Sequence, residues 1–140
     1  MLADTTSDAS LSAGAARIPL EHAKALVARF AEVTTSRDAS VFAQGFTEDC
    51  AVRFNSVELS GRDALQRFMA SLFAPIPASF ICRKTLRAIS GDVLGVEWVS
   101  HWTDPETGKA MKSRGSEFWV MRDDRIARWD AVTAMWADET

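Results

Sequence analysis

Two carboxylates and one guanidinium stand close together near the end of the sequence: Glu117, Arg128 and Asp130. Each lies in a segment that alternates apolar and polar residues, a pattern typical of a β-strand with one buried face. Two carboxylates held close together under apolar side chains resist joint ionisation, so one of them can keep a proton near neutral pH. We therefore treat Asp130 and Glu117 as candidate catalytic acid and base, and Arg128 as a partner for an anionic substrate or intermediate.

The pairing of the strands decides whether these three side chains meet. A hairpin closed by residues 104–109, with Thr103 opposite Ala110, places one row of mostly large apolar residues on the same face as Glu117. We expect this face to be buried against helices. It carries Trp98, Ser100, Trp102, Met111, Ser113, Gly115, Glu117, Trp119 and Met121.

The next turn, within residues 122–125, leaves two registers open. A two-residue turn brings Arg128 and Asp130 to the inner face, together with Ile126, Val132 and Trp136. A three-residue turn reverses the last strand and puts Ala127, Trp129 and Ala131 inside instead. In the first register, the alternative to a catalytic dyad is a structural salt bridge between Glu117 and Arg128.

Aromatic side chains surround this candidate site. Broad π faces favour ring-shaped, apolar guests, and the same residues can equally serve as core. The candidate ligand contacts are Trp98, Ser100, Trp102, Trp119, Phe54 and Phe68. No His or Cys stands near another potential ligand on a shared face, so we expect no metal and no cofactor.

Helical periodicity dominates the first half of the chain. The helix after Ile18 carries an apolar stripe, Asp38 can cap a second helix that stops near Gly45, and Ser60 with Asp63 resembles a capping box for a third. A short strand is predicted between the second and third helices, at Cys50–Phe54, and the second half predicts four long strands, at Phe80–Ile89, Val93–Trp102, Met111–Met121 and Ile126–Trp136. This order predicts an α+β fold, a cone-shaped curved antiparallel sheet with three helices on its concave face.

Composition restricts the class of protein. The 140 residues suit one domain at 18–140, preceded by a loose arm at 1–17 that is rich in Ala, Ser, Thr and Asp. A net charge of −3 without a basic stripe argues against nucleic acid, and no apolar run is long enough to span a membrane. Cys50 and Cys82 fit free buried thiols, so we expect a cytoplasmic protein.

Four short segments at the ends or starts of the predicted elements resemble those of a known family, and the resemblance covers about Leu20 to Trp136. They are Phe46-Thr47-Glu48-Asp49-Cys50-Ala51-Val52, Leu59-Ser60-Gly61-Arg62-Asp63-Ala64-Leu65, Gly115-Ser116-Glu117-Phe118-Trp119 and Asp123-Asp124-Arg125-Ile126. With the order of elements, they resemble the nuclear transport factor 2-like superfamily, in particular its SnoaL-like polyketide cyclase and ketosteroid isomerase group. The resemblance implies a cone around a small apolar pocket and leaves the reaction open, because the superfamily holds both enzymes and binding domains.

Ketosteroid isomerase chemistry itself is not expected from this resemblance. The positions where that enzyme carries its general base and its oxyanion-hole acid hold Phe54 and Ser113, and the sequence has no tyrosine. Two functions remain. One is a cofactor-independent isomerase, cyclase or hydratase acting on a hydrophobic substrate, and the other is a non-catalytic module that binds an apolar ligand. A purely structural dimer whose cone is filled by side chains is a third alternative.

The outer face of the predicted sheet is also apolar. It carries Val93, Val99, Phe118, Val120 and Trp129 among charged residues. An exposed sheet face of this kind is usually covered by a partner, and proteins of the resembled superfamily commonly dimerise through it. We therefore expect a twofold homodimer.

Overall fold

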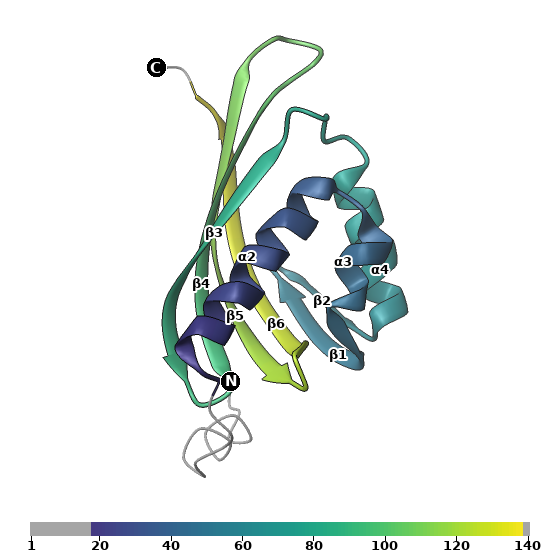
Figure 1. Cartoon of the computed structure of the whole chain (residues 1–140). Coiled ribbons are helices and arrows are strands. Elements are labelled where there is room, and N and C mark those ends of the chain that lie inside the picture. Colours follow the sequence, from purple (N-terminus) through teal and green to yellow (C-terminus); the bar gives the residue numbers. More distant parts are fainter. Residues whose placement is uncertain (1–17, 139–140) are drawn as a thin grey trace.

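Three helices and one six-stranded sheet form the part of the chain that the structure, a computed structural model, describes, residues 18–138 (Figure 1). The helices are α2 (Leu20–Ser36), α3 (Ala39–Gln44) and α4 (Arg62–Phe73). The expected arm at 1–17 lies outside the described residues. The strands are β1 (Phe46–Phe54), β2 (Val57–Ser60), β3 (Ile81–Ser90), β4 (Val93–Thr103), β5 (Ala110–Arg122) and β6 (Arg125–Ala137).

The strand order is β2-β1-β6-β5-β4-β3, and the sheet is mixed. Every neighbouring pair is antiparallel except β1 and β6, which run parallel. The expectation of a purely antiparallel sheet is wrong at this one pair. Its cause is the connection, because the chain leaves β1 for β2, α4 and the β3–β5 meander before β6 returns beside β1.

The helices cover the concave side of the curved sheet, which confirms the predicted α+β cone (Figure 1). Helix α2 packs against β3 through a stripe that buries Ala23, Val27 and Phe30. Helices α3 and α4 pack on each other, and α4 packs on β1. Burial of these apolar stripes supplies most of the driving force, about 25 cal/mol per Å² of apolar surface.

The two predicted helix caps have different outcomes. The Asp38 carboxylate accepts hydrogen bonds from the backbone N–H groups of Ser40 and Val41 at 3.0 and 3.1 Å, so this cap is confirmed. The predicted capping box at α4 is wrong. Gly61 occupies the N-cap position with φ of 94° and the helix has no side-chain cap, while Ser60 ends β2.

Strand β1 is longer than the sequence pattern indicates. The strand expected at Cys50–Phe54 begins at Phe46, directly after Gly45, whose carbonyl accepts a hydrogen bond from the Ile126 N–H at 2.8 Å. This contact ties the chain to β6 immediately after α3. The short β2 hairpin was not predicted at all, because four mostly exposed residues carry almost no burial pattern.

The β5–β6 turn has the predicted two residues, yet the last strand shows the opposite faces. Asp123 and Asp124 both have positive φ, as a type I′ turn requires, and Arg122 pairs with Arg125. Met121 then pairs with Ile126 while Val120 pairs with Arg128, so Ala127 is the extra residue of a β-bulge.

This bulge turns every later side chain of β6 to the other face. Trp129 and Ala131 are buried, whereas Asp130 is partly exposed and Val132 is 59% exposed. The expected inward facing of Arg128, Asp130, Val132 and Trp136 is therefore wrong, and so is the expected outward facing of Trp129.

Candidate functional site: a buried lysine–glutamate pair

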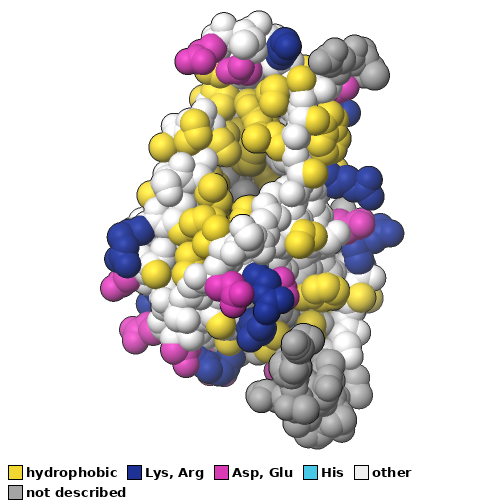
Figure 2. Space-filling model, turned by 180° about the vertical axis from the view of Figure 1, so that it is seen from behind, with side chains coloured by type: hydrophobic (Ala, Val, Ile, Leu, Met, Phe, Trp, Pro, Cys, Tyr) yellow, Lys and Arg dark blue, Asp and Glu magenta, His cyan; other side chains and the backbone are white. Residues whose placement is uncertain are grey.

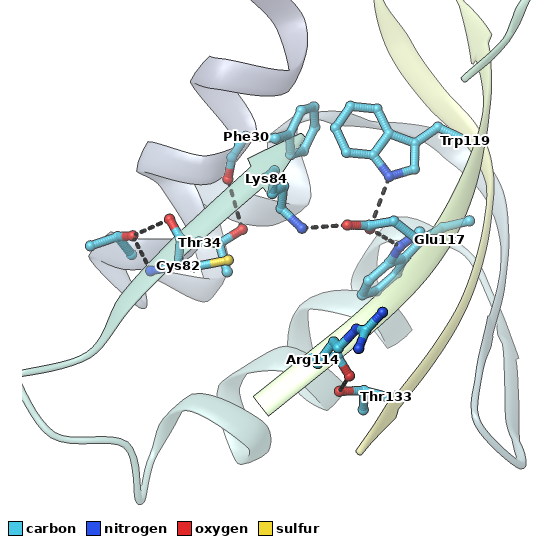
Figure 3. Close-up of polar contacts among 10 residues, drawn as sticks. Phe30, Thr34, Cys82, Lys84, Arg114, Glu117, Trp119 and Thr133 are labelled. Carbon is cyan, nitrogen blue, oxygen red and sulfur yellow. Dashed lines mark hydrogen bonds and ion pairs between the residues drawn. The ribbon is translucent and has the colours of Figure 1, made fainter. Parts of the chain in front are cut away.

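Glu117 is a buried charged residue at the centre of the concave face, only 2% exposed. Its Oε2 atom lies 2.5 Å from Lys84 Nζ. Its Oε1 atom accepts hydrogen bonds from the indole N–H groups of Trp119 and Trp129, at 2.9 and 2.7 Å. Figure 3 shows Lys84 and Trp119 pointing toward Glu117 from different sides. Both carboxylate oxygens therefore have donors, which stabilise the negative charge in a setting without bulk water.

Strand pairing explains why Lys84 reaches this position. Lys84 is paired with Trp98 on β4, and Trp98 is paired with Gly115 on β5. The Trp98 indole lies over Gly115, where a Cβ atom would come within 2.2 Å of the ring. The Lys84 ammonium lies 4.8 Å from the centre of the Trp98 ring, which is a cation–π distance.

Lys84 was missed by the sequence reasoning, although a signal exists. Its strand alternates Cys82, Lys84 and Leu86 on one side, and both neighbours in that row are apolar. The alternation places Lys84 inward, and an inward lysine on an amphipathic strand needs a partner. Glu117 was predicted to face inward, so the two charges could have been matched.

Cys82 lies on the same face of β3 as Lys84 and is buried. Burial raises the pKa of its thiol, the nearby Lys84 charge opposes that shift, and Glu117 adds to it. A thiol held neutral in this way is a poor nucleophile. Cys82 therefore serves as an apolar neighbour of the ion pair.

Two hydroxyl groups lie next to the Trp98–Gly115 pair, on its side toward the β4–β5 hairpin. Ser100 and Ser113 are paired across β4 and β5, and their Oγ atoms form a hydrogen bond. Ser100 is buried and Ser113 is partly exposed. The pair therefore places a polar group on an otherwise apolar surface.

Burial along the concave face falls toward the β4–β5 hairpin. The row of Val96, Glu117 and Ala131 is buried, whereas the row of Ser100, Ser113 and Met135 ends in a methionine that is 65% exposed. Figure 2 shows a hollow in the upper half of the molecule, bordered by hydrophobic side chains. The ion pair thus lies deeper in the cone than the rows that are partly open.

The other predicted aromatic contacts lie on the inner side of the fold. Trp98 and Trp119 are buried, and Trp102 is partly exposed and lies 5.8 Å from Phe80 between ring centres. Phe54 and Phe68 are partly exposed and meet edge to face at 5.6 Å. Their roles as ligand contacts remain predictions.

Asp130 and Arg128 lie on the opposite side of the sheet from Glu117. Asp130 is 3.8 Å from Arg53 in an ion pair whose side chains are about two-fifths exposed. Arg128 is exposed and lines a cleft of about 200 Å³ beside β1 and β2. The expected pairing of Glu117 with Asp130, and its alternative with Arg128, are both wrong because the bulge at Ala127 separates the faces.

Residues 18–138 contain neither a metal-binding cluster nor a membrane-spanning helix. Within that range no three His, Cys, Asp or Glu side chains come together as a possible metal site. In the same residues, no helix has the length and apolar character needed to cross a membrane.

A family model described as a SnoaL-like domain matches residues 27–129. The chain belongs to the SnoaL-like family. The predicted family is thereby confirmed, and the SnoaL-like match spans the elements that hold Lys84, Glu117 and the three tryptophans around them. No curated protein matches the sequence.

Two solved structures show the same SnoaL-like fold. One is the epoxide hydrolase/cyclase-like enzyme SalBIII, described as having a role in pyran ring formation in the polyether salinomycin. Its TM-score is 0.68 at 16% identity, over 82% of this chain and 95% of that chain. The other is a putative isomerase from Bacillus subtilis, with a TM-score of 0.68 at 19% identity, over 81% of this chain and 87% of that chain. At these identities the likeness concerns the fold.

Proposed function

We propose that this SnoaL-like domain is a cofactor-independent isomerase- or cyclase-type enzyme that acts on a small hydrophobic molecule bound in the hollow of the cone. The observation that carries the proposal is the Lys84–Glu117 pair, a proton donor and a proton acceptor buried together on the concave side of the sheet. Family membership and the solved cyclase and putative isomerase of the same fold support this class of reaction.

The hollow suits an apolar, ring-containing guest. Partly exposed aromatic groups from three parts of the fold, Phe54, Phe68 and Trp102, supply broad faces for packing. The Ser100–Ser113 hydroxyl pair adds a polar point that can orient such a guest.

The sequence predicted that Asp130 and Glu117 transfer the proton. We propose that Lys84 and Glu117 do so instead. A carboxylate with a single charged partner at 2.5 Å can exchange a proton with a substrate only if that contact rearranges. We therefore propose Glu117 as the acid/base candidate that is coupled to Lys84, and we no longer assign this role to Asp130.

The alternative function is a binding module without turnover. It is favoured by the three donors around Glu117, which satisfy both of its oxygens and make the pair resemble a structural anchor. In this case the hollow holds an apolar ligand unchanged.

The deciding experiment compares matched carboxylate variants. Ring-containing ketones and epoxides are screened by thermal shift, and those that stabilise the wild type are incubated with it and followed by mass spectrometry. Glu117→Gln should abolish turnover, whereas Asp130→Asn, on the outer face, should leave it unchanged.

Three results change this picture. Binding without turnover supports the module. Loss of activity in Asp130→Asn with retention in Glu117→Gln contradicts the assigned site. A wild type that no probe stabilises contradicts the hollow as a binding site.

We also propose that the domain forms a twofold homodimer through the convex face of the sheet. Phe118 is 59% exposed there, Val99 52% and Val132 59%, on adjacent strands. Ser116 is paired with Val132, and Gly95 with Phe118, so small residues stand beside two members of this patch. The free thiols of Cys50 and Cys82 support the further proposal of a cytoplasmic location.

A further inference from the structure

We propose that the cleft on the convex side of the sheet binds a short zwitterion, a molecule of about dipeptide size with an ammonium group at one end and a carboxylate at the other. The cleft crosses β2, β1 and β6, which lie side by side (Figure 1). Asp130 separates it from Phe118, a member of the proposed dimer surface. The inference is independent of the hollow, which lies on the other face of the sheet.

The alternation of side chains along the strands shapes this cleft. Its floor is the row in which Val52 pairs with both Leu59 and Trp129. Because these three side chains pack into the core on the concave side, the row presents mainly backbone to the cleft. The two neighbouring rows point outward and form the walls. One wall is Ser60, Ala51 and Arg128, and the other is Glu58, Arg53 and Asp130.

Two opposite charges stand at the two ends of the cleft, Glu58 on β2 and Arg128 on β6. Both side chains are exposed, and among residues 18–138 neither has a hydrogen bond or an ion pair. Arg53, on the strand between them, has Asp130 as its partner at 3.8 Å. Water hydrates exposed charges well, so Glu58 and Arg128 cost the free protein little and stay available to a ligand.

The distance between the two ends sets the length of the ligand. Since β1 lies between β2 and β6, the backbones of the outer two strands are about 9–10 Å apart. A charge-assisted hydrogen bond at each end takes about 2.7–2.9 Å, which leaves about 4 Å between the charged groups of the ligand. An α-amino acid carries both charges on one carbon, whereas a dipeptide separates them by a further residue, about 3.5 Å of extended chain.

The volume of the cleft agrees with this length. It measures about 200 Å³. This is the liquid volume of about seven water molecules, enough for a dipeptide with small side chains. Ala51 stands in the middle of one wall, and its small side chain leaves this space open.

Charge balance favours a zwitterion over a simple ion. The walls carry two charges of each sign, from Arg53, Arg128, Glu58 and Asp130. An anion or a cation alone would match one end and leave the charge at the other end unmatched. A zwitterion places its carboxylate at Arg128, whose planar guanidinium binds both oxygens, and its ammonium at Glu58. The Ser60 hydroxyl, on the same strand as Glu58, can accept a second hydrogen bond from the ammonium.

Three forms of one peptide test the assignment: alanylalanine, its N-acetyl derivative and its C-terminal amide. Each derivative lacks one of the two charges. Nuclear magnetic resonance titration of the ¹⁵N-labelled protein should show alanylalanine binding in the millimolar range and each derivative binding about two- to fivefold more weakly. The amide signals that move should belong to the residues that line the cleft. Added salt should weaken the binding of alanylalanine.

Variants of the protein separate the two ends. Arg128→Gln should weaken alanylalanine and leave the affinity for its amide unchanged, because the amide has no carboxylate. Glu58→Gln should weaken alanylalanine and leave the affinity for the N-acetyl derivative unchanged. Arg114→Gln is the matched control, since Arg114 is an exposed arginine on β5 outside the cleft. Ala51→Leu should abolish binding of all three forms, because its side chain fills the cleft.

The same spectra report whether each variant is folded. Equal affinities for the three peptides overturn the recognition of a zwitterion. Equal effects of Arg128→Gln and Arg114→Gln show a general effect of surface charge and overturn the site. The absence of signal shifts around the cleft in the wild type also overturns it. None of these results bears on the hollow or on the Lys84–Glu117 pair.

Discussion

Lys84 and Glu117 are opposite charges that the fold removes almost completely from water. Taking two charges out of water costs several kcal/mol for each ion, and their attraction and hydrogen bonds repay that cost only when the geometry is good. Here the geometry includes two indole donors in addition to the ammonium. The pair is therefore strongly coupled, and loss of one member should cost more than loss of both.

Glu117→Leu should destabilise the domain by about 3–5 kcal/mol, because it leaves the Lys84 charge buried and two indole N–H groups without an acceptor. The double variant Glu117→Leu/Lys84→Met should be less destabilised than the sum of its two single variants. Urea unfolding followed by tryptophan fluorescence measures all three. Simple additivity of the free energies of unfolding would show that the pair is not coupled.

Gly115 is the second residue on which the site depends, because the Trp98 ring fills the space of its missing side chain. Gly115→Ala should push Trp98 away from the sheet and destabilise the domain by about 1–3 kcal/mol, the usual cost of overpacking. It should also change near-ultraviolet circular dichroism. Gly95→Ala on the same sheet is the matched control, since its Cβ would meet its nearest neighbour at 3.5 Å. Equal effects of the two substitutions would contradict this account.

Sequence reasoning recovered one charged residue of the site, Glu117, and missed the other. The inward position of Glu117 could be predicted because β4 and β5 pair as expected, with Thr103 opposite Ala110, and the alternation along β5 then fixes its face. Lys84 was overlooked because a lysine on an edge strand is ordinarily solvent-exposed. The contact between them spans β3 to β5 and depends on Trp98 and Gly115 between them, which no local pattern encodes.

At the scale of elements, the long β-strands were predictable to within about two residues at each end because their alternation and turn residues agree. The short β2 and the first half of β1 were not, since their structure depends on contacts with distant segments such as the hydrogen bond from Ile126 to Gly45. The bulge at Ala127 was invisible for the same reason. The bulge lets Trp129 pack in the core and leaves the two-residue turn before it unchanged.

The two helix starts give a matched prediction. Asp38→Ala should destabilise the domain by about 1 kcal/mol, because the carboxylate caps two backbone N–H groups of α3. Asp63→Ala in the first turn of α4 should cost only about 0.3 kcal/mol, since α4 has no side-chain cap and only its dipole is affected. Thermal unfolding of both variants checks the order, and a larger loss at Asp63 would contradict it.

At the scale of the whole molecule, the domain has two apolar surfaces on opposite sides of one sheet. The concave surface borders the hollow, and the convex surface carries Phe118, Val99 and Val132. A partner on the convex face leaves the hollow open to ligand. Dimer formation and ligand binding should therefore be separable by substitution.

Phe118→Glu should convert the proposed dimer to a monomer, because it places like charges opposite each other near a twofold axis. Sedimentation equilibrium at micromolar concentrations measures the state. Leu20→Glu is the control, since Leu20 is 53% exposed on α2 and away from the sheet. A monomeric wild type, or a Phe118→Glu protein that remains dimeric, would contradict the proposed interface.

The extra residue at Ala127 has a consequence for how this fold tolerates changes of length. Deleting Ala127 would make Ile126 and Arg128 consecutive opposite Met121 and Val120, so the bulge would be lost while Arg128, Trp129 and Asp130 keep their faces. Glu117 would then keep both indole donors, because Trp129 stays opposite Trp119. Loss of the bulge can thus absorb a one-codon deletion, whereas the same deletion in a strand without an extra residue would turn part of that strand to its other face.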